Sequence, residues 1–243
     1  VIVHSRFNGD YTGMVICKSH SVHVYEDARS LDREPENMRI LLDEEVHSKA
    51  DVQKLGIRPG DLISMEPRYV ETKSGFIKSR HIDDKSSVAV LVECLRLLKE
   101  NNLQPAYDTW FSFPIFEEIG LGGTYVPEEV DEFAALDIGL IGENQEGDEH
   151  KVSIGGSDNI APYDWQLTNF LISLAEENGV GYTVDCFYRY GSDATAAVRA
   201  GNNIIPAVFG VACMNSHGYE RCHVQGIEET LNLAMAYVLT ESR

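Results

Sequence analysis

The sequence lacks several features that mark other classes of protein. No apolar run approaches the ~20 residues that a membrane-spanning helix needs, so we expect no membrane partner. The first residues mix His4, Arg6 and Asp10 with few apolar side chains, and we expect no signal peptide. Basic residues are scarce: Lys and Arg number 20 against 39 Asp and Glu, which gives a net charge of -19. Because a phosphate backbone binds a basic surface, we expect no nucleic-acid partner.

Cysteine is infrequent and irregularly spaced. The five cysteines are Cys17, Cys94, Cys186, Cys213 and Cys222, and no two of them have C-x-x-C spacing. An odd number without paired spacing indicates reduced thiols rather than a disulfide framework, and we expect a cytoplasmic protein. The rest of the composition, 43% hydrophobic and 24% charged in 243 residues, is typical of a soluble globular protein with a real core.

The first part of the chain is rich in short apolar runs and turns. The runs "GMVICKS" and "MRILLDE" have polar flanks and are predicted strands. The segment "KADVQKLG" predicts one short helix that ends at Gly56, and Pro59-Gly60 predicts a turn before a further strand. We interpret residues 1–74 as a small β-barrel or sandwich domain.

From residue 75 onward, predicted strands alternate with predicted helices. The expected helices are 86–100, 163–178 with Gly179 as their stop, 192–200 with Gly201 as C-cap, and 226–241. Apolar runs between them, such as "DTWFSFPIF", "YTVDCFY" and "IPAVFGVA", are expected to be strands. This alternation predicts an α/β fold for residues 75–243, with a mostly parallel or mixed sheet flanked by helices.

Acidic residues follow several of these runs. Asp83-Asp84, Glu117-Glu118 and Glu143 lie at expected strand ends, and His217 follows "IPAVFGVA". Ligand sites in open α/β sheets lie beyond the carboxyl ends of the strands, so we expect these side chains in one crevice. Carboxylates that close together repel one another unless cations lie among them. Carboxylate with imidazole suits zinc, cobalt or manganese, and we predict a site for divalent metal ions.

Each of these residues alone has a simpler interpretation. Asp83 or Asp84 would serve as a helix N-cap, and a surface turn would hold Glu117 and Glu118. Glu143 would be a solvated loop acid, and His217 a hydrogen-bonded loop histidine. Their order along the chain favours a shared site over these separate explanations. His223 is a second histidine that competes with His217 for the role of ligand.

The chain resembles a known family at this point. The segments "RHIDDKSSVAVLVECLRLL", "FSFPIFEEIGLGG", "YGSDATAAVRAG" and "SHGYERCH" are similar to motifs of the co-catalytic metallo-aminopeptidases that include deblocking and glutamyl aminopeptidases. The segment "LGIRPGDLISMEP" resembles the end of the small β domain that this family inserts into its catalytic domain. The resemblance covers nearly the whole chain.

The resemblance implies a role for individual residues. Asp83 matches the carboxylate that bridges two metal ions, Glu117 the general base, and Glu118 and His217 metal ligands. Glu143 falls where the family has an aspartate ligand, after "DIGLIG". Two further residues, Ser192 and Asp193, match a loop beside the substrate pocket. The implied function is removal of N-terminal residues from peptides through water activated by two divalent metal ions, with zinc or cobalt favoured over manganese, in a homo-oligomer.

The family also carries a His-x-Asp motif ahead of its inserted β domain. That stretch would precede Val1, and we expect this chain to lack it together with the first part of the catalytic domain. This expectation keeps an alternative open, namely a catalytically impaired aminopeptidase-like protein that serves in binding or assembly. A glycosidase that uses Glu117 and Glu118 as an acid/base pair is disfavoured, because adjacent strand residues point to opposite faces and such a pair must flank a sugar ring.

Overall fold

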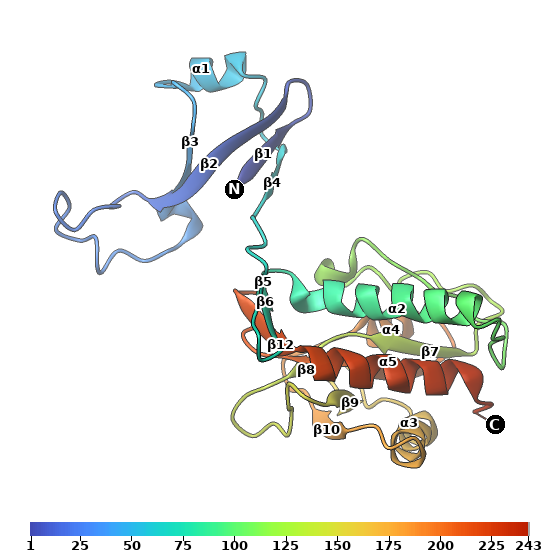
Figure 1. Cartoon of the computed structure of the whole chain (residues 1–243). Helices are drawn as coiled ribbons and strands as arrows, with labels where there is room; N and C mark the ends of the chain where they lie inside the picture. Colours follow the sequence, from blue (N-terminus) through green and yellow to red (C-terminus); the bar gives the residue numbers. More distant parts are fainter. Residues whose placement is uncertain (243) are drawn as a thin grey trace. The chain divides into compact units, whose positions relative to one another are not determined.

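The computed structural model describes residues 1–242, and its chain divides into two compact units, Val1–Pro67 and Arg68–Arg243 (Figure 1). We call these unit 1 and unit 2. The boundary expected after residue 74 falls inside unit 2, between β5 (Val70–Glu71) and β6 (Phe76–Ser79), which pair with each other. None of the helices in residues 1–242 combines the length and the apolar character that a bilayer-spanning helix needs.

Unit 1 contains an antiparallel sheet in the order β3-β2-β1-β4. The strands and helices of this unit are β1 (Ile2–Ser5), β2 (Gly9–Cys17), η1 (Pro35–Asn37), β3 (Met38–Leu42), α1 (Lys49–Lys54) and β4 (Leu62–Ser64). Helix α1 begins where the Ser48 side chain accepts a hydrogen bond from the Asp51 N–H, which satisfies one of its free donors. The predicted strands and short helix are confirmed, whereas the structure does not show the barrel that we expected.

Unit 2 is built around a mixed sheet in the order β10-β9-β11-β7, with β8 also paired to β11. Its strands are β7 (Glu132–Leu136), β8 (Gly139–Leu140), β9 (Val152–Ser157), β10 (Tyr182–Cys186) and β11 (Ile205–Cys213). The pairs β10–β9, β11–β7 and β11–β8 are parallel, while β11–β9 is antiparallel. The predicted α/β class is confirmed in its mixed form.

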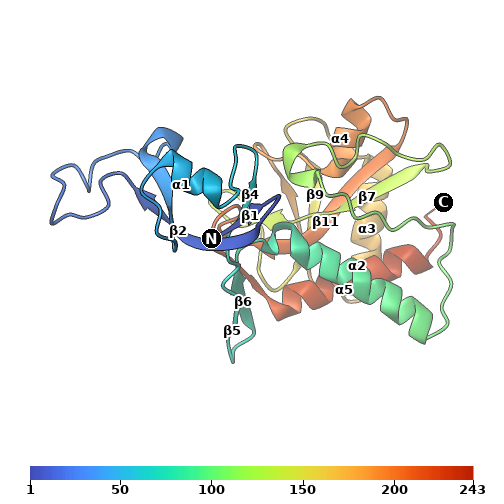
Figure 2. The same cartoon turned by 90° about the horizontal axis from the view of Figure 1, so that it is seen from above.

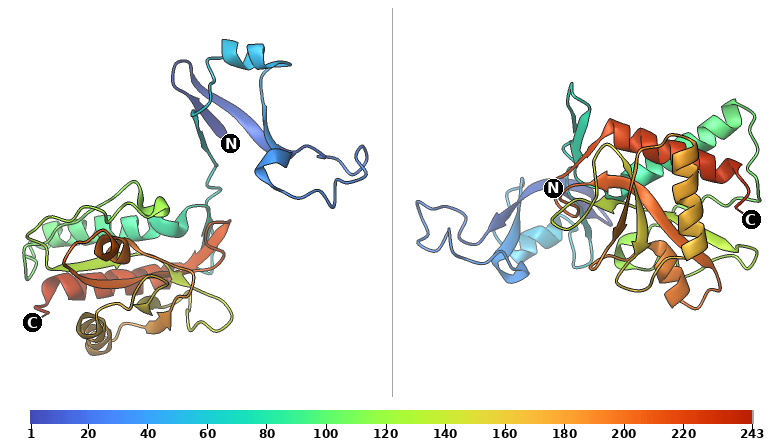
Figure 3. Two further views of the ribbon diagram at one scale, coloured as in Figure 1. Left: turned by 180° about the vertical axis from the view of Figure 1, so that it is seen from behind. Right: turned by 90° about the horizontal axis from the view of Figure 1, so that it is seen from below.

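The residues of β11 show which helices cover which face of this sheet. The helices are α2 (Ile82–Glu100), α3 (Trp165–Glu177), α4 (Asp193–Arg199) and α5 (Val224–Leu239). Phe209 and Val211 belong to a core cluster with residues of α2, α3 and α5, whereas Val208 packs with Ala194 of α4. Successive strand residues point to opposite faces, so α4 lies on one face and the other three helices on the opposite face (Figures 2 and 3).

The helix ends follow the local chemistry that the sequence predicts. The Asp164 side chain accepts from the Leu167 N–H at the start of α3, and Gly179, with φ 67°, follows its end. Gly201, with φ 96°, follows α4, and the His223 side chain accepts from the Gln225 N–H at the start of α5. The predicted glycine stops are confirmed. The assigned span of α2 begins at Ile82, but Asp83 and Asp84 have non-helical φ and ψ, so regular helix follows them, close to the predicted start at Ser86.

A second sheet and one irregular segment complete unit 2. The sheet is antiparallel in the order β12-β6-β5, where β12 is Glu220–His223. The run 109–116, expected to be a strand, has no strand structure and leads into the 3-10 helix η2 (Glu117–Ile119). A strand requires a hydrogen-bonded neighbour, and Pro114 cannot donate to one. The apolar pattern alone therefore did not make a strand.

Candidate metal centre

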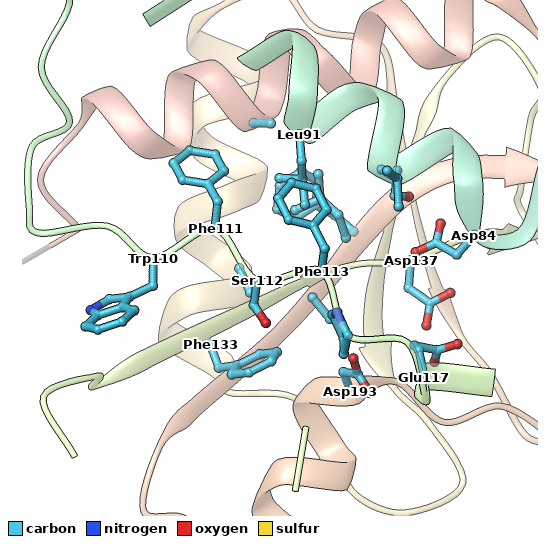
Figure 4. A pocket seen from close by; sticks show the side chains of 18 of the residues that line it. Asp84, Leu91, Trp110, Phe111, Ser112, Phe113, Glu117, Phe133, Asp137 and Asp193 are labelled. Atoms are coloured by element: carbon cyan, nitrogen blue, oxygen red, sulfur yellow. The ribbon is translucent and has the colours of Figure 1, made fainter. Parts of the chain in front are cut away.

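Side chains from four separate segments gather near the carboxyl ends of β7 and β11. Asp83 and Asp84 lie at the start of α2, Glu117 and Glu118 lie in η2, and Asp137 directly follows β7. The loop between β11 and β12 contributes a histidine, as described below. A close view shows Asp84, Glu117 and Asp137 pointing toward one another (Figure 4). The Asp83-Asp84 peptide bond is cis.

The first group of possible metal ligands consists of Asp83, Glu118 and His217, whose ligand atoms lie within 4.8 Å of one another. The Nε2 atom of His217 is 3.5 Å from Oδ2 of Asp83, and its Nδ1 atom is 3.9 Å from Oε2 of Glu118. The side chain of Asp83 is 8% exposed, whereas those of Glu118 and His217 are open to solvent. The group therefore has one buried member and two that an ion from solvent can reach.

The second group consists of Asp83, Asp84 and Asp137, again with ligand atoms within 4.8 Å of one another. Asp137 is only 5% exposed, and its pKa is raised by burial first and then by the charges of Asp84 and Glu117. Asp83 belongs to both groups. A carboxylate shared in this way is placed where it could bridge two neighbouring cations.

Burial and mutual repulsion raise the pKa values of the carboxyl groups at this site. Burial, followed by the charge of Glu118, raises the pKa of Asp83 to about 7. Burial, followed by the charges of Asp193 and Glu118, raises the pKa of Glu117 to about 7. Burial also raises the pKa of Asp84 well above its usual range. Without a cation, these carboxyls oppose one another's ionisation.

The residues present fit divalent cations. Oδ1 of Asp84 is buried and makes no hydrogen bond with any described residue. A buried polar atom without a partner is costly, and a cation among the carboxylates would supply the interaction. Oxygen ligands with one imidazole are the donor set that zinc, cobalt and manganese accept.

Two close backbone approaches place these acids. A Cβ on Gly210 of β11 would lie 1.6 Å from the carbonyl oxygen of Asp137, so only glycine lets the end of β7 come so near. A Cβ on Gly122 would lie 2.3 Å from Oδ2 of Asp193. The glycine-rich loop that follows Glu117 and Glu118 therefore packs directly on Asp193.

A cavity of about 640 Å³ opens beside the acids. Asp83, Asp84, Glu117, Glu118, Asp137 and Asp193 line its acidic part. Figure 4 shows Glu117 and Asp137 at one end and Trp110 at the other, with Phe113 between them. The site thus joins an acidic end to a largely apolar hollow.

The other predicted site residues lie in different surroundings. Asp193 lines the cavity, and its Oδ1 is buried without a described partner. Ser192 is 3% exposed, and its hydroxyl is 2.9 Å from that of Tyr163. Glu143 is exposed and belongs to neither ligand group. His223 is 2.8 Å from the Ser74 carbonyl through Nε2 and caps α5, so the structure brings His217 rather than His223 to Asp83.

Asp137 is a candidate ligand that the sequence alone does not predict. The sequence predicts a ligand after "DIGLIG", at Glu143, but β7 ends at Leu136 and the short strand β8 intervenes before Glu143. The first side chain beyond β7 is that of Asp137. The available signal was the position of this aspartate directly after the apolar run "FAAL".

Unit 2 thus has a mixed sheet with helices on both faces, and carboxylates and a histidine lie near its strand ends. The sequence profile of the M42 glutamyl aminopeptidases matches residues 1–233. The chain belongs to this family. A Bacillus subtilis (strain 168) protein named "Putative aminopeptidase YhfE" is 43% identical over 229 residues, or 94% of this chain. The chain spans 66% of the length of that curated relative.

Solved structures share the fold. A TET aminopeptidase from a marine sediment archaeon of the Thaumarchaeota has a TM-score of 0.81 at 17% identity, over 98% of this chain and 69% of that one. The TET1 peptidase of Pyrococcus horikoshii, described as able to assemble into a tetrahedron or a large octahedral shell, has a TM-score of 0.75 at 20% identity. That match covers 99% of this chain and 72% of the other. At these identities the likeness concerns the fold.

Proposed function

We propose that this chain carries the catalytic part of a metal-dependent aminopeptidase, which hydrolyses N-terminal residues from peptides through water activated by two divalent cations. One observation carries the proposal: Asp83 belongs to two ligand groups at once, with Glu117 beside them. Membership of the M42 family supports the same activity.

Five residues would bind the cations, and one further residue would act as the general base. Asp83, Glu118 and His217 would hold one cation, and Asp83, Asp84 and Asp137 the second. We assign Asp137 in place of Glu143, because Asp137 is buried within the group. Two divalent cations, when bound, lower the pKa of water and polarise a carbonyl. The cations would be zinc or cobalt, with manganese as a further candidate.

Glu117 would move the protons. It belongs to neither ligand group, yet Asp83 and Glu118 both act on its pKa. A carboxylate that is not occupied in holding a cation can accept a proton from water and return it to the leaving amine.

The cavity would receive the substrate. The acidic end would face the peptide's free amino terminus, and the apolar hollow beside it would take side chains of the peptide. Asp193 lines this space, so we propose it as a substrate-binding residue. Ser192 would support it from the buried side, through its contact with the Tyr163 hydroxyl.

We further propose that the two parts of the chain have different tasks. Residues 1–74 would be the small inserted β-barrel domain used in assembly, and residues 75–243 would be the catalytic domain. The solved neighbour described as a tetrahedron or octahedral shell supports a homo-oligomer.

The test compares two peptides that differ only at the amino terminus. Release of the first residue is measured from an unblocked peptide and from its N-acetylated form, after EDTA treatment and after return of Zn²⁺, Co²⁺ or Mn²⁺. We expect hydrolysis of the unblocked peptide only, and only with metal. Cleavage that persists in EDTA, or that ignores the acetyl group, would contradict the proposal.

A further inference from the structure

Glu220 is a buried acid that the proposed mechanism does not use. It lies in β12, is 2% exposed, and belongs to neither ligand group. Its carboxylate accepts hydrogen bonds from three backbone N–H groups. Oε2 accepts from Ile82 at 2.5 Å and from Asp83 at 3.1 Å, and Oε1 accepts from His217 at 2.9 Å.

These three N–H groups come from two separate segments. Asp83 lies 137 residues before Glu220 in the sequence, at the start of α2, whereas His217 precedes Glu220 by three residues in the loop after β11. Asp83 and His217 are also the pair whose Oδ2 and Nε2 atoms are 3.5 Å apart. One carboxylate therefore ties together the backbones of two proposed ligands.

The segment that leads into α2 is irregular. His81 has a left-handed backbone with φ 64°, its side chain makes no capping hydrogen bond, and Asp83 and Asp84 have non-helical φ and ψ. The backbone N–H groups of Ile82 and Asp83 therefore need acceptors from another part of the chain. Glu220 supplies a charged acceptor to both from a different strand.

The His217 loop needs the same support. His217 has φ 60°, a backbone conformation that residues with a Cβ rarely adopt. The hydrogen bond that its N–H donates to the buried, charged Glu220 carboxylate helps to hold that conformation. Its imidazole is exposed, so the backbone contact fixes a side chain that has little packing around it.

We propose that Glu220 is a positioning residue, which orders Asp83 and His217 for metal binding through their backbone N–H groups before any cation arrives. This inference rests on the proposed metal centre. Groups that orient metal ligands typically change metal affinity 10–100-fold when they are lost.

The decisive variant is Glu220→Gln, examined in the metal-free full chain. Its single amide oxygen can serve Ile82 and Asp83 together, which leaves an NH₂ group facing the His217 N–H. We expect hydrogen exchange of the His217 amide, followed by NMR, to speed up roughly tenfold or more, because a hydrogen bond to a charged group is lost. The Asp83 amide should change less. Unchanged exchange at His217 would overturn the inference.

The matched control is Glu149→Gln. Glu149 is also a buried acid, 8% exposed, but its carboxylate pairs with Arg221 at 2.8 and 2.7 Å rather than with a ligand backbone. If loss of a buried charge merely loosened unit 2, both variants would speed up exchange at His217. We expect only Glu220→Gln to do so, while core amides of β11 stay protected in both.

The second measurement uses Co²⁺ alone as the probe, titrated into each protein and followed by its visible absorption. We expect affinity to fall 10–100-fold in Glu220→Gln and to stay within about twofold in Glu149→Gln. Equal affinity in wild type and Glu220→Gln would overturn the positioning role. If wild type does not bind Co²⁺ through Glu118 and His217, that result counts against the proposed metal centre and not against the positioning role. Hydrogen exchange at His217 is measured without metal, so it tells these two failures apart.

Discussion

The sheets of the two units bury their residues very differently. In unit 2, seven consecutive residues of β11, from Ala207 to Cys213, are buried, and both described clusters of buried apolar side chains lie in this unit. In unit 1, all three residues of β4 are exposed, with Leu62 at 74% and Ile63 at 50%. A sheet covered on both faces holds its strand ends in fixed positions. The acids of the candidate site belong to the unit that has this covered sheet.

The largest expected effect is on the rate of hydrolysis at the site in unit 2, without a change in the stability of that unit. Glu117→Gln should lower the rate of peptide hydrolysis about 10²–10⁴-fold, because a general base contributes on that order. Metal affinity and unfolding should stay close to wild type. Steady-state hydrolysis measures the rate, and metal titration measures the affinity. Glu128→Gln is the matched control, since Glu128 and Glu129 form another Glu-Glu pair, and both residues are exposed. Normal turnover in Glu117→Gln would refute the role.

The next effect tests the covered sheet itself. Phe209→Ala in β11, where Phe209 is 1% exposed, should lower the free energy of unfolding by about 3–5 kcal/mol, because it leaves a cavity in the core. Urea denaturation of the metal-free protein measures the loss. A cost under about 1 kcal/mol would mean that this core is not packed as described.

A third comparison decides between two acids near β7 and β8. Asp137→Asn should weaken binding of Co²⁺ at least about tenfold, because it alters a group in the buried cluster. Glu143→Gln removes an exposed acid and should leave the affinity unchanged. Competitive titration with a metal indicator measures both variants. If Glu143→Gln weakened Co²⁺ binding more than Asp137→Asn, the ligand would be Glu143, as the sequence predicts, and not Asp137.

The dependence of stability on pH should differ between the units. The folded pKa values of Asp83 and Glu117, about 7, lie above the usual values near 4, so the folded metal-free protein binds more protons between these limits. Their contribution is fully present below about pH 4 and is lost as pH rises through about 7. Urea unfolding in EDTA should show a smaller decline from pH 5 to 8 in Glu117→Gln, which lacks one titrating carboxyl. An equal decline in the free energy of unfolding of wild type and Glu117→Gln would show that the Glu117 carboxyl is not a source of this pH dependence.

In unit 1 the shift has the opposite sign. Hydrogen bonds from Ser48, first of all, and from Lys54 lower the pKa of Asp51. Its contribution is present above the usual pKa and is lost as pH falls through the lowered one. The pH dependence of unit 1 from this residue therefore falls in the acid range, away from the neutral range of the site.

The smallest expected effect is at the uncovered sheet. Leu62→Ala in unit 1 should change the free energy of unfolding by no more than about 0.5 kcal/mol, because Leu62 is 74% exposed. The same urea experiment as for Phe209→Ala measures it. A loss near that of Phe209→Ala would show that Leu62 is covered in solution, and would remove the contrast between the two sheets.

Local features of the chain were predictable. The glycines after α3 and α4, the apolar strand β11 and the order of the acidic motifs were all visible in the sequence. The run 109–116 was not, because its apolar pattern fits a strand but strand structure depends on a neighbour elsewhere in the chain. The antiparallel direction of β9 beside β11 was equally hidden, since either direction satisfies the same pattern of side chains.

The class of fold, the positions of most helices and the acids available for a metal centre follow from the sequence alone, because caps, stops and periodicity depend on residues a few positions apart. Which of those acids lie together depends on the folded structure. It brought Asp137 rather than Glu143 to Asp83, and it placed the Glu220 carboxylate beside the backbone N–H groups of Ile82 and Asp83. Such contacts depend on pairing between segments that lie far apart in the sequence, such as β12 with β6, and no local pattern records that pairing.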